Sequence, residues 1–267
     1  MRPVRTLLGA VLAAAAALLT ALPAQAQAQV QAGAHYVALG DSYSSGTGTG
    51  SYYGESGSCK RSQYAYPALW AASHAPASFK FVACSGARTG DVLANQVGAL
   101  SATTTLATVS VGGNDAGFTD VITACTFGTD QVCVDRVDKA KTYATTTLPG
   151  LLDNVYAQIR NRAPSARVVV LGYPRLYKVP GSCSVGLSDT KRSAINSAAD
   201  TLHTVISRRA AAKSFTYRDL RGAYAGHEIC SADWWLNSLS WPVEESYHPN
   251  RSGQRLGYLP QLNAVTG

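Results

Sequence analysis

The chain has 267 residues, a formal net charge of +7, six cysteines and a hydrophobic fraction of 46%. This length suits one α/β domain with a full core, preceded by a short leader. The charge is moderate and forms no dense basic cluster, which argues against a nucleic-acid-binding protein. The cysteines form no C-x-x-C pair and the histidines are scattered, so we expect no metal site and no cofactor.

Residues 1–32 have the layout of a secretory signal peptide. Arg2 and Arg5 precede an apolar run at residues 7–22, and alanines at alternate positions follow it. The run has about 16 residues, whereas a membrane span needs about 20, so we expect cleavage rather than anchoring. Three cleavage points fit: after Ala26, Ala28 or Ala32. We therefore expect a secreted, extracellular protein whose residues 33–267 form a single domain with 21 basic and 16 acidic side chains.

Short apolar runs alternate with helical patterns along residues 33–267. The runs predict five strands, at residues 35–39, 79–83, 106–111, 166–172 and 215–220. The helical patterns lie at residues 67–74, 91–100, 149–162 and 188–212. Apolar runs bounded by Gly or Pro are typical of buried parallel strands. Their alternation with helices predicts right-handed crossovers and a three-layer α/β/α sandwich around a five-stranded parallel sheet.

An even number of cysteines in an exported chain predicts three disulfides. Fifteen pairings exist for six cysteines. We expect the sequential one, because local closure is favoured in a chain-ordered fold: Cys59–Cys84, Cys125–Cys133 and Cys183–Cys230.

Candidate reactive groups follow three of the predicted strands. Ser42 follows the first strand, Gly86 the second and Asn114 the third. Ligands of open parallel sheets bind at the carboxyl ends of the strands, so these groups are expected on one edge. The long segment 116–148, which contains Cys125 and Cys133, leaves the same edge and is expected to wall a pocket there.

Ser42 is a candidate nucleophile that needs a base, because a hydroxyl is scarcely ionised near neutral pH. His248 is the best candidate, since Pro249 holds it in extended backbone on a loop before a C-terminal helical segment. His227 is its competitor. The other three histidines fall within or beside predicted strands and helices: His35, His74 and His203. Asp41 is not expected to be the triad acid, because neighbouring side chains on an extended strand point to opposite faces. We expect it to tie the loop together instead.

The imidazole of His248 needs an acceptor on its other nitrogen to hold its orientation. Glu245 could supply a carboxylate, and the backbone carbonyl of Ser246 could act without a side chain. We favour the carbonyl. An anionic tetrahedral intermediate would need donors, and the Ser42 N–H, the Gly86 N–H and the Asn114 amide are the candidates for this oxyanion hole.

These residues resemble the sequence blocks of the SGNH (GDSL) hydrolases in order and spacing. The blocks are Gly40-Asp41-Ser42, Gly86, Gly112-Gly113-Asn114-Asp115 and His248-Pro249. Within that family the chain resembles secreted actinobacterial lipases and phospholipases A. The resemblance implies a flavodoxin-like sandwich, no metal, Ser42 as nucleophile, His248 as base, and Ser42, Gly86 and Asn114 as oxyanion donors. The family pattern has Asp three residues before the histidine, where this chain has Glu245, which is compatible with a Ser–His dyad.

The expected function is hydrolysis of lipid carboxylic esters through an acyl-enzyme, by a monomer that binds lipid interfaces transiently. Two alternatives remain open: a carbohydrate acetyl esterase, and a non-catalytic lipid- or sugar-binding module on the same fold. Four aromatic residues are candidates for lining an acyl groove: Tyr43, Trp234, Trp235 and Trp241.

Overall fold

A parallel five-stranded sheet forms the centre of the protein. The computed structural model describes residues 33–181 and 186–267. The strands are β1 (His35–Ala38), β2 (Ser78–Phe81), β3 (Leu106–Val109), β4 (Arg167–Leu171) and β5 (Thr216–Arg218). Their spatial order is β2-β1-β3-β4-β5, and every neighbouring pair is parallel. This is the flavodoxin-like order, and it confirms the predicted fold class.

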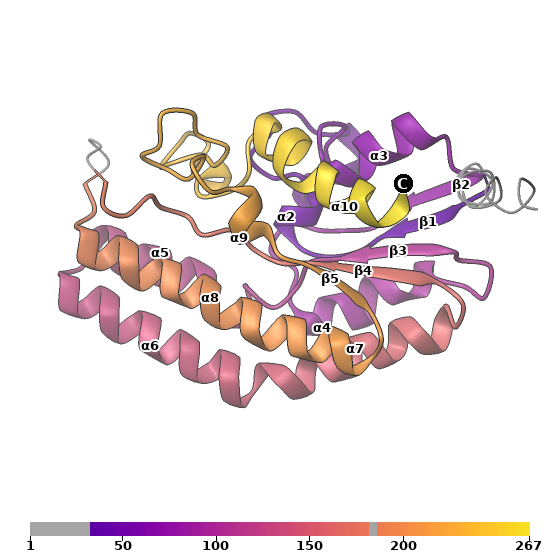
Figure 1. The fold of residues 1–267 in the computed structure, drawn as a ribbon, viewed down its shortest axis with the longest axis horizontal. Helices are drawn as coiled ribbons and strands as arrows, with labels where there is room; N and C mark the ends of the chain where they lie inside the picture. Colours follow the sequence, from indigo (N-terminus) through magenta and orange to yellow (C-terminus); the bar gives the residue numbers. More distant parts are fainter. Residues whose placement is uncertain (1–32, 182–185) are drawn as a thin grey trace, which may run out of the picture.

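Helices cover both faces of the sheet (Figure 1). The longer ones are α3 (Tyr66–His74), α5 (Phe118–Phe127), α6 (Asp130–Thr146), α7 (Leu148–Arg162), α8 (Asp189–Ala212) and α10 (Leu259–Thr266). Figure 1 shows α6, α7 and α8 on one face and α3 and α10 on the other. Short helices α2 (Ser42–Ser45), α4 (Thr89–Asp91) and α9 (Leu220–Ala223) follow strands β1, β2 and β5.

Burial explains why the central strands were easier to predict than the edges. All of β3 and residues 168–171 of β4 are buried, because helices cover both faces there. The edge strands β2 and β5 are only partly buried, so their sequences are less continuously apolar. Each predicted strand is present, although each is shorter than its apolar run.

Two predicted regions differ in detail from the structure. Residues 91–100 were expected as one helix, but they form the end of α4, then the π-helical η2 (Val92–Gln96) and the 3-10 turn η3 (Val97–Ala99). Gly90 lies in α4 and Gly98 in η3, and glycine weakens helix propensity at both positions. The segment 116–148, expected only as a wall, consists mostly of the helices α5 and α6.

Two of the predicted disulfides are present, Cys59–Cys84 and Cys125–Cys133. Cys230 is also disulfide-bonded, and its predicted partner, Cys183, lies outside the described residues. The predicted signal peptide, residues 1–32, also lies outside them. Within residues 33–181 and 186–267, no helix has the length and apolar character of a membrane span.

Candidate active site

The turn between β1 and α2 presents Ser42 at the carboxyl edge of the sheet. Gly40 has a φ of +128°, and a Cβ there would lie 2.6 Å from the Ser110 carbonyl oxygen, so the turn requires glycine. The Gln96 side chain accepts from the Gly40 N–H and donates to its carbonyl, at 2.7 and 2.9 Å. Asp41 then caps α2 by accepting from the Tyr43 N–H. These contacts hold Ser42 as the first residue of the helix.

Ser42 and His248 meet although 206 residues separate them. The His248 Nε2 lies 2.8 Å from the Ser42 Oγ, which is hydrogen-bond distance. The His248 Nδ1 lies 2.8 Å from the Ser246 carbonyl oxygen. A carbonyl only accepts, so Nδ1 carries a proton and Nε2 is free to take one from the serine. Glu245 points elsewhere, since its Oε1 accepts from the Tyr52 hydroxyl at 2.6 Å.

Packing holds the His248 ring in this orientation. The ring centroid lies 5.3 Å from that of Tyr43 and 6.0 Å from that of Phe118. The Tyr43 hydroxyl donates to the Tyr247 carbonyl, which ties α2 to the histidine loop. Gly48 allows close approach, because a Cβ there would lie 2.8 Å from the His248 Cβ. Burial lowers the pKa of His248 from 6.5 to about 4, so the imidazole is neutral near pH 7.

Unused N–H donors gather beside this pair. Within the described part of the chain, the backbone N–H groups of Ser42 and Gly86 make no hydrogen bond. Gly86 has a φ of +79°, and nothing would contact a Cβ there, so its backbone is open. The Asn114 amide donates one proton to the Ala87 carbonyl at 3.0 Å, which links the second and third sequence blocks. The other amide proton makes no bond to any described residue.

Asp41 belongs to a buried network that sequence reasoning recognised only in part. Its Oδ1 accepts from the Tyr43 N–H, and its Oδ2 accepts from the Tyr173 hydroxyl. The Tyr173 hydroxyl also accepts from the Gly113 N–H at 3.2 Å. Tyr173 therefore joins the turn before Ser42 to the turn before Asn114. Its position after the fourth predicted strand, on the same sheet edge, was the signal that could have identified it.

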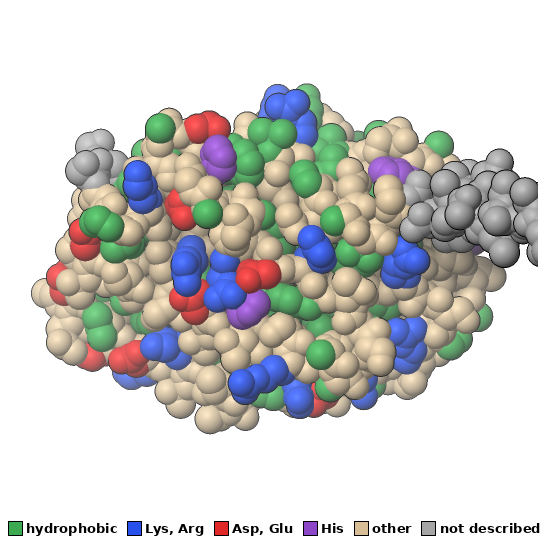
Figure 2. All heavy atoms as spheres, in the orientation of Figure 1, with side chains coloured by type: hydrophobic (Ala, Val, Ile, Leu, Met, Phe, Trp, Pro, Cys, Tyr) green, Lys and Arg blue, Asp and Glu red, His purple; other side chains and the backbone are tan. Residues whose placement is uncertain are grey.

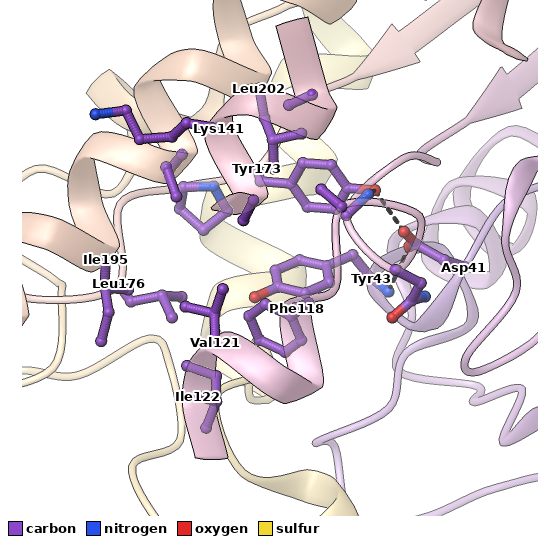
Figure 3. Close-up of a pocket in the computed structure, with 18 of the residues that line it drawn as sticks. Asp41, Tyr43, Phe118, Val121, Ile122, Lys141, Tyr173, Leu176, Ile195 and Leu202 are labelled. Carbon is purple, nitrogen blue, oxygen red and sulfur yellow. Dashed lines mark hydrogen bonds between the residues drawn. The ribbon is translucent and has the colours of Figure 1, made fainter. Parts of the chain in front are cut away.

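An apolar pocket opens beside Ser42 (Figure 3). The space between its walls is about 700 Å³ when the part open to solvent is included, and about 60 Å³ of it admits the centre of a water molecule. Phe118, Val121 and Ile122 of α5 line one side, and small residues of α6 line another. The face of α8 toward the pocket consists of Ile195, Ala198, Ala199 and Leu202. As predicted, the segment 116–148 walls the pocket.

Of the four aromatic residues expected along an acyl groove, only Tyr43 lines this pocket. The prediction was wrong for the tryptophans. Trp235 is buried, and its ring stacks on that of His227 at a centroid distance of 3.6 Å. Trp234 is partly buried in the same loop, and Trp241 is 90% exposed. His227 thus packs against Trp235, and its Nδ1 lies 3.1 Å from the Asp233 carbonyl oxygen.

The other charged groups near the site have internal partners. Asp115 accepts from the N–H and the hydroxyl of Thr89, so it anchors the start of α4. Among the residues that the structure describes, no group of three or more His, Cys, Asp or Glu side chains could hold a metal ion. The site consists of a serine–imidazole pair, free N–H donors and an apolar pocket, which is an arrangement suited to acyl transfer.

The chain is similar in sequence and in structure to several known proteins. Residues 38–256 match the model of the GDSL-like lipase/acylhydrolase family. Lipase 1 of Streptomyces coelicolor is 56% identical over 256 residues, which cover 96% of this chain and 95% of the relative. The crystal structure of phospholipase A1 from Streptomyces albidoflavus superposes with a TM-score of 0.85 at 57% identity, over 87% of this chain and 99% of that one. An extracellular lipase from Streptomyces rimosus gives 0.84 at 56% identity, over 86% and 98%. The chain therefore belongs to the GDSL-like lipase/acylhydrolase family.

Proposed function

We propose that this protein hydrolyses carboxylic esters of lipids through an acyl-enzyme on Ser42. In the first half-reaction, Nε2 of His248 takes the Ser42 proton as Oγ attacks the ester carbonyl carbon. The same imidazolium then gives the proton to the departing alcohol oxygen, which leaves the acyl group on Ser42. In the second half-reaction, water attacks the acyl group, His248 takes its proton, and the fatty acid leaves as Ser42 recovers its hydrogen.

The Ser246 carbonyl takes the place of the usual triad carboxylate in this proposal. It accepts the Nδ1 proton at 2.8 Å and thereby selects the tautomer in which Nε2 can act as the base. A neutral acceptor stabilises the imidazolium less than a carboxylate would. The lowered pKa of His248 is consistent with a neutral acceptor, and it keeps the imidazole unprotonated until the Ser42 proton is transferred to it.

Three donors are proposed to stabilise the oxyanion of the tetrahedral intermediate. They are the Ser42 N–H, the Gly86 N–H and the second Asn114 amide proton. Each of them is without an internal partner among the described residues, and such donors act strongly where water is excluded. The bond from Asn114 to the Ala87 carbonyl supports this assignment, because it fixes the amide next to the Gly86 turn.

The lipid substrate is supported by the apolar pocket that opens beside Ser42, which is the observation that carries the proposal. Its walls are mostly apolar, and they extend from α5 to the small residues of α6 and α8. An acyl chain fits such a surface, whereas an acetylated sugar would need more polar groups than the few that line it, such as Asn114 and Lys141. The names of the relatives, lipase and phospholipase A1, point to the same substrate class.

Secretion is part of the proposal. Residues 1–32 have the pattern of a cleaved signal peptide, and the similar lipase of Streptomyces rimosus is described as extracellular. The disulfides Cys59–Cys84 and Cys125–Cys133 fit an oxidising compartment. N-terminal sequencing of the exported protein would test this, and a start between residues 27 and 33 is expected.

A substrate comparison tests the function directly. Purified protein should release long-chain fatty acids from phosphatidylcholine or triacylglycerol, and the Ser42→Ala variant should lose this activity by about 10⁴–10⁶-fold. Acetate release from acetylated xylan measures the carbohydrate-esterase alternative. Faster acetate release than fatty-acid release would contradict the lipid assignment, and equal activity of Ser42→Ala would contradict the nucleophile.

A further inference from the structure

An exposed apolar loop precedes the catalytic histidine. Residues 238–246, here called the apolar loop, are closed at their base by two backbone bonds, Asn237 N–H to the His248 carbonyl at 2.9 Å and Tyr247 N–H to the Asn237 carbonyl at 3.0 Å. Trp241 is 90% exposed, Leu239 58% and Val243 57%. We propose that this loop inserts into the surface of a phospholipid bilayer and thereby brings the active site to its substrate.

The apolar loop is held from inside by polar contacts, so its apolar side chains are not needed for its shape. The Ser240 N–H donates to the Ser246 hydroxyl at 2.9 Å. The Asn237 amide donates to the carbonyls of Gly48 and Glu245. Trp241 does not hold the loop in shape. A large, exposed aromatic side chain of this kind is favoured at a lipid interface, where tryptophan is enriched.

The apolar loop lies at the reactive end of the molecule. In Figure 1 the loops between α9 and α10 lie at the left of the view, on the side of α5, and α2 lies nearer the centre. The hydroxyls of Tyr247 and Thr126 lie 3.5 Å apart, which brings the base of the loop against the end of α5. Phe127, the last residue of α5, is 83% exposed. Exposed apolar side chains therefore lie on two segments that border the Ser42–His248 pair.

The charges of the apolar loop favour apolar insertion over attraction to anionic lipid. Glu244 forms an ion pair with Lys60 at 2.7 Å, and Glu245 accepts from the Tyr52 hydroxyl. The loop itself contains no Lys or Arg that could attract an anionic headgroup. Figure 2 shows Lys and Arg side chains interspersed with Asp and Glu on the face it presents, with no broad basic patch there. Binding to zwitterionic phosphatidylcholine should therefore persist when salt screens charges.

This inference rests on the proposed function, because a bilayer is relevant only if the substrate is a lipid. Vesicle binding is measured without turnover by placing every loop variant in the Ser42→Ala background. The probe is phosphatidylcholine vesicles with brominated acyl chains, which quench tryptophan that enters the apolar layer. Trp70 and Trp235 are buried and Trp234 is partly buried, so Trp241 is the most exposed reporter among the four tryptophans.

Bromolipid should quench part of the emission, and Trp241→Phe should remove this quenching while vesicles still sediment the protein. Replacing Leu239, Trp241 and Val243 together by Ala should weaken sedimentation about tenfold or more. Leu256→Ala, at a 43% exposed position outside the loop, is the matched control and should bind normally. Unchanged sedimentation of the triple variant, or binding that requires anionic lipid and disappears in salt, would overturn the proposal.

Activity assays of variants that keep Ser42 separate this proposal from the proposed function. The triple variant should keep its kcat/KM for a monomeric short-chain aryl ester within about twofold and lose about tenfold on vesicles. Equal loss on both substrates would show that the loop acts through His248 and not through lipid. A wild-type protein with no activity on either substrate would contradict the proposed function itself, whereas vesicle binding by Ser42→Ala would still test the loop.

Discussion

The substitution Tyr173→Phe removes one hydroxyl from the network that joins the turn before Ser42 to the turn before Asn114. The ring itself should stay in place, because it packs edge-on against Tyr43 at a centroid distance of 5.1 Å. The lost groups are then a donor to Asp41 and an acceptor for the Gly113 N–H. The variant therefore isolates the hydrogen bonds of the network from its packing.

The two lost hydrogen bonds make different contributions to the free energy of unfolding. A hydrogen bond to a charged group contributes about 1.5–3 kcal/mol. The Gly113 bond is long, at 3.2 Å, so its loss is worth about 1 kcal/mol at most. With Asp41 ionised, we expect the free energy of unfolding to fall by about 2–4 kcal/mol. With Asp41 protonated the first bond is neutral, and the expected loss is about 1–2 kcal/mol.

The pH dependence has a definite sign. Burial raises the pKa of Asp41 from 3.8 to about 7, and the bond from Tyr173 opposes this rise. The folded protein binds more protons than the unfolded chain between these values, so the contribution of Asp41 to stability falls as pH rises from about 4 to 7. Without the Tyr173 hydroxyl the pKa rises further, and the fall continues above pH 7. The variant should therefore be more strongly destabilised at pH 8 than at pH 5.

Urea unfolding of the oxidised protein at pH 5 and pH 8 measures this difference. Tyr143→Phe is the control, because the Tyr143 hydroxyl makes no hydrogen bond to the described residues. A loss for Tyr173→Phe that is equal at both pH values would refute the reasoning about Asp41. A loss below about 0.5 kcal/mol at pH 8 would show that the network does not stabilise the turn.

Four further results are expected. Glu245→Gln should keep at least about a tenth of the activity, whereas loss of a triad carboxylate costs about 10⁴ in kcat; a loss of that size would restore Glu245 as the third member. Asn114→Ala should lower kcat by about 10²–10³-fold with little change in KM, and an effect confined to KM would remove it from the oxyanion hole. Because the pKa of His248 is lowered to about 4 and only the neutral ring accepts a proton, kcat/KM on a soluble ester should fall on the acid side well below pH 6.5; an acid limb at 6.5 or above would contradict this. Ala199→Phe should block the pocket between α6 and α8 and shift preference toward shorter acyl chains, so an unchanged chain-length profile would show that the acyl group lies elsewhere.

The sequence predicted the sheet and its reactive edge because each depends on local patterns. Apolar runs bounded by Gly mark buried strands, and groups that follow parallel strands must share an edge. Ser42, Gly86 and Asn114 could be named for that reason, whereas His248 was named from its place before Pro249 on a loop near the C-terminus. The distance of 2.8 Å between the Ser42 Oγ and the His248 Nε2 could not be predicted from the sequence. It depends on how Gly48 and Tyr43 contact the loop that carries His248, which comes from the far end of the chain.

The pocket and the tryptophans show what local patterns cannot decide. The helical pattern at residues 188–212 does not indicate that Ile195, Ala198, Ala199 and Leu202 line a pocket. A core face and a pocket wall have the same periodicity. Trp235 and Trp241 lie six residues apart in one loop region, yet one is buried and the other exposed. Trp235 packs against the rings of His227 and Tyr224, whereas Trp241 lies on the exposed apolar loop.

Covalent labelling tests the central claim most directly. A long-chain fluorophosphonate should form one adduct, and peptide mapping should place it on Ser42 in the wild-type protein and in Glu245→Gln. His248→Ala should slow this labelling by roughly 10²–10⁴-fold, the usual contribution of a general base. Stoichiometric labelling at another residue, or labelling of Ser42 at an undiminished rate without the imidazole, would contradict a serine activated by His248.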